Sequence, residues 1–154
     1  MRIAFYAPLK SPEHPTPSGD RQMARLLIRA LTAGGATVEA ASHLRVYLPA
    51  PSQSQWEDCK QQAKLEVVRI AEAWTSGRVP DLWFCYHPYY KSPDLLGPAL
   101  VRRFGIPYVT AEASYSQRRS DGIWRECQER VANCVSLAAT NFCFTRRDRD
   151  GLAA

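Results

Sequence analysis

Several features that identify common classes of protein are missing from this chain of 154 residues. No stretch approaches the roughly 18 consecutive apolar residues of a membrane-spanning helix, and the apolar run near the N-terminus is too short for a signal peptide. The phosphate-loop pattern Gly-x-x-x-x-Gly-Lys-Ser/Thr is absent, which excludes a phosphate-loop NTPase. The pattern Gly-x-Gly-x-x-Gly is absent too, so a dinucleotide site of the dehydrogenase type is unsupported.

Disulfide and metal-binding patterns are also missing. The five cysteines form no Cys-x-x-Cys pair, and no histidine lies at the spacing of a zinc site. Each cysteine lies within an apolar pattern, and their odd number fits reduced thiols in a cytoplasmic protein. We therefore expect no metal, no cofactor and a cytoplasmic location. The length and the ordinary globular composition predict one domain over residues 1–154.

Positive charge is the main bias that is present. The formal net charge is +5, and arginines cluster at residues 102–103, 118–119 and 146–149. The first interpretation is solvated helix ends and loops, because Asp148 and Asp150 dilute the last cluster. The second is peripheral contact with an anionic membrane at its inner face. We expect no nucleic-acid partner.

Apolar runs alternate with helical periodicity along the whole chain. Strands are predicted at residues 2–8, 37–42, 44–48, 82–86, 106–111 and 141–145, with 44–48 at the sheet edge. Helices are predicted from Asp20 to the glycines at 34–35, at 53–76, from residue 92 or 97 to Gly105, and at 123–138. Such alternation gives right-handed crossovers. The predicted fold is α/β: a single Rossmann-like doubly wound parallel sheet of about six strands, with helices on both faces.

The loop at residues 8–18 has a special place in this fold. Its four prolines are incompatible with a helix or a central strand, so it must cross the surface where the first strand ends. With the usual strand order, the winding reverses between the first strand and the strand at 82–86, and ligands bind in the crevice there. We expect this loop and residues 86–91 to form two walls of the crevice, and Glu112 and Ser114 to close its far side.

Single residues at this crevice allow a functional and a structural interpretation. Gly19 precedes a helix N-terminus, where free N–H groups favour a phosphate, or it is a turn residue. His87 can donate a hydrogen bond or move a proton, or it is a structural histidine. Glu112 can orient a sugar hydroxyl or pair with an arginine. The tyrosines at 86, 89 and 90 can form a platform for a sugar ring or belong to the edge of the core.

Taken in order, several segments resemble the N-terminal domain of GT-B glycosyltransferases of the group 1, family 4-like type. They are residues 2–8, Pro17-Ser18-Gly19-Asp20-Arg21 at the start of a helix, residues 80–83 leading to His87, residues 105–110 with Glu112, and residues 140–152. The resemblance spans nearly the whole chain. It implies the N-terminal half of a GT-B fold, in a retaining enzyme that moves a sugar from a nucleotide-sugar donor to a sugar or lipid-linked acceptor.

The same resemblance implies roles for individual residues. Gly19 and Asp20 would form the loop that faces the diphosphate and the transferred sugar, and His87 and Glu112 would be catalytic. The family often has histidine where this sequence has Glu112, which is a departure from its pattern. The acceptor-side candidates are Lys10, Tyr89, Lys91, Ser114 and Arg118.

A larger departure is the absence of a second half. Members of the family carry a second Rossmann-like domain, with a Glu-x7-Glu type motif, that binds the nucleotide sugar, and this sequence contains no such domain. We therefore expect the acceptor-side half of an enzyme, inactive in isolation, whose donor is bound by the missing C-terminal domain. Two alternatives stay open: a non-catalytic interaction module, and a small phosphate-binding flavodoxin-like protein.

Overall fold

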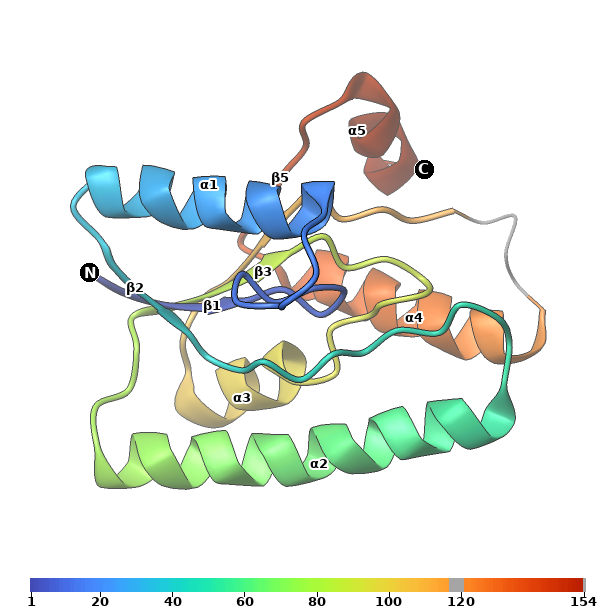
Figure 1. Ribbon diagram of the computed structural model, residues 1–154, viewed down its shortest axis with the longest axis horizontal. Helices are drawn as coiled ribbons and strands as arrows, with labels where there is room; N and C mark the ends of the chain where they lie inside the picture. Colours follow the sequence, from blue (N-terminus) through green and yellow to red (C-terminus); the bar gives the residue numbers. More distant parts are fainter. Residues whose placement is uncertain (117–120, 154) are drawn as a thin grey trace.

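The computed structural model describes residues 1–116 and 121–153 (Figure 1). Strands and helices alternate, as predicted for an α/β fold. The strands are β1 (Arg2–Tyr6), β2 (Thr37–Ala40), β3 (Leu82–Tyr86), β4 (Tyr108–Ala111) and β5 (Thr140–Phe142). The helices are α1 (Gly19–Ala33), α2 (Gln53–Ser76), α3 (Gly97–Phe104), α4 (Gly122–Leu137) and α5 (Arg146–Ala153). No helix within these described ranges has both the length and the apolar character needed to cross a membrane.

The strands form one parallel sheet in the order β2-β1-β3-β4-β5. Strand β1 therefore lies beside both β2 and β3, and the winding reverses between β1 and β3, as the sequence predicted. The prediction of about six strands was wrong, because the described residues contribute five strands to the sheet.

Alternate residues of the central strands face two separate apolar layers. Ile3 and Phe5 of β1 pack with residues of α1 on one face of the sheet. Ala4 and Tyr6 lie in the cluster that includes residues of α2, α3 and α4 on the other face. Figure 1 shows α1 on one side of the sheet and α2 and α3 on the opposite side. This two-sided burial explains why β1 and β3 are apolar at nearly every position.

The segment at residues 44–48, predicted as an edge strand, is not a strand. Its backbone bonds to loops: the Val46 N–H donates to the Pro8 carbonyl (2.9 Å), and the Leu48 N–H donates to the Lys91 carbonyl (2.8 Å). Val46 and Leu48 are fully buried in a small cluster with Trp56 of α2 and Cys127 of α4. The apolar residues that suggested a strand instead anchor this segment across the loops that follow β1 and β3.

Helix α3 begins at a buried carboxylate. Asp94 Oδ1 accepts hydrogen bonds from the backbone N–H groups of Leu96 and Gly97 (2.8 Å each), which lie at the start of the helix. Its Oδ2 accepts from Trp83 Nε1 (2.9 Å) and from the Tyr108 hydroxyl (2.8 Å). We call Asp94, Trp83 and Tyr108 the Asp94 cluster. It joins α3 to the first residues of β3 and β4.

Candidate functional site

The loop at residues 8–18 is held in place by arginine side chains. Arg25 Nε donates to the Pro12 carbonyl (2.7 Å), and Arg45 Nε donates to the Leu9 carbonyl (3.0 Å). Arg21 Nη1 donates to the carbonyls of residues 14 and 15 (2.9 and 3.1 Å). Because proline lacks an N–H, the loop offers mainly carbonyl acceptors, and guanidinium groups satisfy them. The sequence pattern assigned these three arginines no role, so sequence reasoning missed it.

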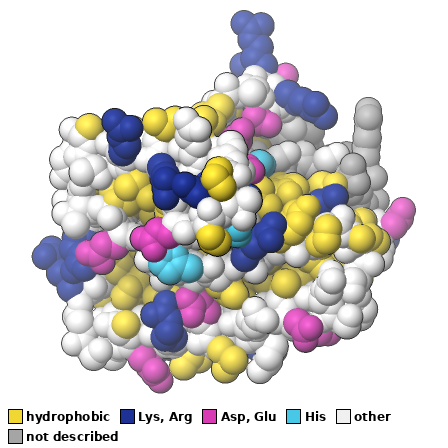
Figure 2. All heavy atoms as spheres, viewed as in Figure 1, with side chains coloured by type: hydrophobic (Ala, Val, Ile, Leu, Met, Phe, Trp, Pro, Cys, Tyr) yellow, Lys and Arg dark blue, Asp and Glu magenta, His cyan; other side chains and the backbone are white. Residues whose placement is uncertain are grey.

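A histidine from the segment after β2 also contacts this loop. His43 Nδ1 lies 2.8 Å from the Ser11 hydroxyl, and its Nε2 lies 3.5 Å from a Glu13 carboxylate oxygen. On the face shown in Figure 2, histidine and basic side chains lie together near the centre, where Figure 1 places the loop that follows β1. The loop is therefore a fixed wall built by polar contacts.

Helix α1 begins beside this wall. Ser18 caps the helix, its Oγ accepting a hydrogen bond from the Arg21 N–H (3.2 Å). Gly19 is exposed, and a Cβ placed there would have no heavy atom within 4 Å, so the backbone faces open space. Asp20 places a carboxylate in the first turn, where the helix dipole stabilises negative charge. That carboxylate would oppose a diphosphate bound at Gly19.

His87 follows β3 in an unusual backbone conformation. Its φ is +57°, in the left-handed region that costs a non-glycine residue about 1–2 kcal/mol. Its N–H donates to the Ala111 carbonyl (2.8 Å), which ties the turn to β4. The ring Nδ1 is 3.3 Å from Asp20 Oδ1. Nδ1 is buried, and the angles of this contact do not make a hydrogen bond, so the atom has no hydrogen-bond partner among the described residues.

Glu112 follows β4 in the same conformation. Its φ is +56°, and its N–H donates to the Phe142 carbonyl (2.8 Å). His87 and Glu112 are the two non-glycine residues with positive φ in the described chain. They end neighbouring strands, so two strained turns lie side by side at the carboxyl edge of the sheet. Strain of this kind gathers at functional sites.

Tyr86 connects these groups. Burial raises the pKa of its hydroxyl well above the usual value, and the charge of Glu112, a hydrogen bond to Glu112 and the charge of Asp20 raise the pKa further. The carboxylates of Asp20 and Glu112 therefore lie near one tyrosine, beside the His87 ring. We call Asp20, Tyr86, His87 and Glu112 the strand-end cluster. The structure thus brings together four of the residues that the sequence placed at the crevice.

Aromatic rings extend from this cluster toward α4. The His87 ring stacks on Tyr89, with centroids 5.0 Å apart; Tyr89 contacts Tyr90 at 5.6 Å, and Tyr90 contacts Trp124 at 5.1 Å. Burial is the main reason that the pKa of Tyr89 rises to about 12. Tyr86 itself is buried in the core, whereas Tyr89 and Tyr90 are half-buried. Trp124 lies in the helix predicted at 123–138, and the helical pattern alone does not indicate its place in a row of rings.

The structure describes three of the four remaining predicted acceptor-side residues. Lys91 Nζ donates to the Pro49 carbonyl (3.0 Å) and lies over the Tyr90 ring, so it holds the 44–50 segment. Lys10 is half-buried within the loop at 8–18. The Ser114 N–H donates to the Pro88 carbonyl (3.1 Å) and links the loops that follow β3 and β4. Arg118 lies outside the described residues.

The arrangement can orient hydroxyl groups and hold a proton. An imidazole beside a carboxylate is a donor and acceptor pair that accommodates either protonation state of the ring. A second carboxylate and a row of half-buried rings complete a surface with a polar end and an aromatic flank. No protein-family model matches the chain, and no curated protein matches it either, so the site rests on its own geometry.

Proposed function

We propose that this chain is the acceptor-side domain of a retaining GT-B glycosyltransferase. One observation carries the proposal: the strand-end cluster lies at the point where the winding of a parallel sheet reverses, with His87 and Glu112 both in left-handed turns. Ligands of doubly wound sheets bind at such a point. The order of the sequence segments that resemble a GT-B N-terminal domain supports the same assignment.

In this proposal the acceptor sugar lies against Tyr89 and its reacting hydroxyl faces His87. Stacking of the sugar on a half-buried ring would orient it, and the imidazole would accept a hydrogen bond from, or donate one to, the hydroxyl. Asp20, whose Oδ1 lies 3.3 Å from His87 Nδ1, would fix the direction of the ring. Glu112 would orient a second hydroxyl.

The donor nucleotide is assigned to a second domain. The loop before α1 offers exposed backbone at Gly19, but Asp20 in the same turn repels a diphosphate. Stabilisation of the leaving diphosphate would therefore come mainly from groups on the other domain, with Gly19 supplying one N–H. Isolated, this chain should bind acceptor sugars weakly and nucleotide sugars hardly at all.

The test is a pair of titrations of the chain followed by backbone amide NMR. A panel of mono- and disaccharides should shift the amide signals of His87, Tyr89 and Glu112, whereas uridine and guanosine diphosphate sugars should not bind tightly. His87→Ala should abolish the sugar response. His43→Ala should leave it intact, because His43 is exposed and contacts Ser11 and Glu13, which lie outside the strand-end cluster. Tight binding of a nucleotide sugar to this chain alone would contradict the assignment.

A second candidate function is favoured by the strand order. The order β2-β1-β3-β4-β5 is that of flavodoxin-like sheets, which bind a phosphate-bearing ligand at the switch between β1 and β3. In that case the loop before α1 binds the phosphate without a partner domain. Titration with flavin mononucleotide and with inorganic phosphate distinguishes the two candidate functions. Amide shifts centred on Ser18 and Gly19 would favour a phosphate-binding flavodoxin-like protein over a glycosyltransferase domain.

A further inference from the structure

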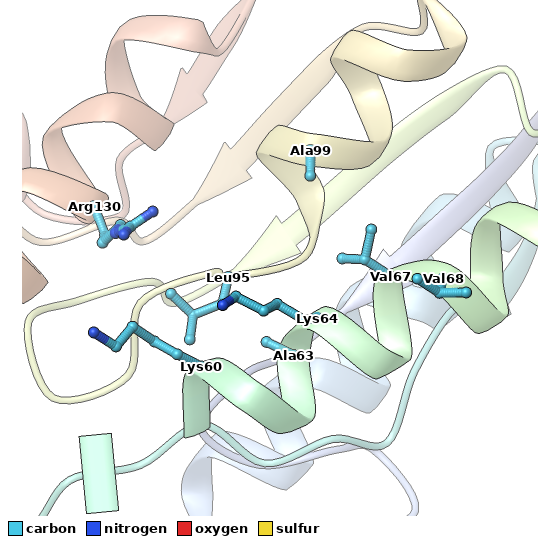
Figure 3. A pocket seen from close by; sticks show the side chains of 8 residues that line it. All are labelled: Lys60, Ala63, Lys64, Val67, Val68, Leu95, Ala99 and Arg130. Carbon is cyan, nitrogen blue, oxygen red and sulfur yellow. The ribbon is translucent and has the colours of Figure 1, made fainter. Parts of the chain in front are cut away.

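An apolar groove lies on the helical layer, away from the strand-end cluster. It runs between α2, the turn before α3 and α4, and encloses about 340 Å³ (Figure 3). Ala63 and Val67 of α2, Leu95 and Ala99 line its apolar part. This volume is at the lower end of the range for small-molecule sites.

Basic side chains meet at one end of the groove. Lys60 and Lys64 of α2 and Arg130 of α4 line it together with the apolar residues. In Figure 3 the charged ends of these three side chains lie on one side, and Ala99 and Val67 lie on the other. The groove is therefore amphipathic along its length, with a cationic end and an apolar end.

Acidic neighbours neutralise part of this charge. Glu126 lies 3.4 Å from both Lys60 Nζ and Arg130 Nη2, and Lys60 Nζ is 2.9 Å from Glu57. Glu126 also accepts a hydrogen bond from Trp56 Nε1 (2.7 Å), which keeps it in place. Three cations and two carboxylates leave one net positive charge.

Lys64 carries the charge that is left over. Its side chain is exposed, and in the part of the chain that the structure describes no carboxylate is paired with it. One unpaired ammonium beside an apolar trough is complementary to a ligand with one negative charge and an apolar body.

A single chain of methylene groups suits the size of the groove better than a peptide helix does. One turn of an α-helix, about 10 Å across with a rise of 5.4 Å, occupies roughly 400 Å³, against about 340 Å³ in the groove. We propose that the groove binds the anion of a medium-chain fatty acid, with its carboxylate at Lys64 and its chain along Val67, Leu95 and Ala99. This site is separate from the proposed acceptor site and stands without it.

The test is calorimetric titration of the chain with decanoate below its micelle-forming concentration. Acetate, which lacks the chain, and 1-decanol, which lacks the charge, are the matched ligands, and both should bind at least about tenfold more weakly than decanoate. Lys64→Glu should weaken decanoate binding about tenfold or more, because attraction becomes repulsion. Ala99→Phe should abolish binding by filling the apolar end. Both positions are exposed, so neither variant should disturb folding.

The control variant is Arg29→Glu, an equal charge reversal on the exposed side of α1, across the sheet from the groove, which should leave decanoate affinity unchanged. Equal affinity for decanoate and 1-decanol, or unchanged binding by Ala99→Phe, would overturn the proposal. So would failure to bind decanoate combined with sedimentation on phosphatidylglycerol vesicles, which would assign the basic groove to a membrane surface.

Discussion

The two polar clusters of this fold differ in how completely their hydrogen bonds are made. Asp94 is 1% exposed and accepts four hydrogen bonds, from Trp83, Tyr108 and two backbone N–H groups. The strand-end cluster has two residues in left-handed turns and a buried His87 Nδ1 without a hydrogen-bond partner in the described chain. A buried polar group whose bonding capacity is filled by the protein stabilises one structure, whereas unfilled capacity held in strained turns is available to a ligand.

The largest effect is expected from removing the Asp94 carboxylate. Asp94→Ala leaves the indole N–H, the Tyr108 hydroxyl and two helix-start N–H groups without their acceptor. We expect the free energy of unfolding to fall by about 3–5 kcal/mol, since each buried donor left unsatisfied costs about 1–3 kcal/mol and relaxation recovers part. Urea unfolding followed by tryptophan fluorescence measures it. The exposed Asp81, which accepts one backbone hydrogen bond, is the control, and an equal loss in Asp81→Ala would contradict this account.

Two glycines give the next comparison. A Cβ at Gly97 would lie within about 2.5 Å of Trp83 Nε1, Asp94 Oδ2 and a Tyr108 ring carbon, whereas a Cβ at Gly19 would meet open space. Gly97→Ala should therefore destabilise the protein by about 1–3 kcal/mol through overpacking. Gly19→Ala should be neutral or slightly stabilising, because alanine is the better helix former.

Thermal unfolding of the two glycine variants checks this difference. A ligand that approaches the Gly19 backbone should nevertheless bind Gly19→Ala more weakly than the unmodified chain. If the two variants unfolded at the same temperature, the side chains of the Asp94 cluster would be able to shift at little cost to make room for a Cβ at residue 97.

Periodicity and apolar runs predicted the layers of this fold because they record which residues are buried. They placed the 53–76 helix, the 82–86 strand and the reversal of winding, and with them the edge at which His87 and Glu112 lie. They failed at residues 44–48, where an apolar run packs against Trp56 of α2 and Cys127 of α4 and its backbone bonds to loops instead of to a neighbouring strand. Backbone conformation at His87 depends on contacts with β4, which no local pattern encodes.

A smaller effect on stability is expected from substitutions in the left-handed turn at Glu112, and it separates backbone strain from the chemistry of the side chain. Glu112→Gly and Glu112→Ala both remove the carboxylate, but only glycine adopts a φ of +56° without cost. The glycine variant should be more stable than the alanine variant by about 1 kcal/mol. Both should bind acceptor sugars more weakly than the unmodified chain. At Ser114, whose φ is not positive, the alanine variant should be more stable than the glycine variant. If the glycine variant were the more stable one there too, its stabilisation would reflect a preference of the whole loop for glycine and not the φ of residue 112.

The smallest expected effect is on folding stability at alkaline pH, and it depends on Tyr89 in the row of aromatic rings. The pKa of Tyr89 is raised from 10.0 to about 12, first by burial and then by the negative charges of ionised Tyr47, Asp20 and ionised Tyr90. Between these two values the unfolded chain loses the phenolic proton and the folded chain keeps it, so the unfolded state binds fewer protons and stability falls as pH rises. Below pH 10 the contribution of this group is constant.

Tyr89→Phe removes this proton but keeps the ring and its stacking on His87. The variant should lose less stability than the unmodified chain between pH 10 and pH 12, the interval set by the raised pKa of Tyr89. Urea midpoints at pH 8, 10 and 11.5 measure the difference. If the urea midpoints of the two proteins fell in parallel as the pH rises, the Tyr89 hydroxyl would be exposed to water in the folded protein. The Tyr89 ring would then lie on a solvated surface and not in a half-buried one.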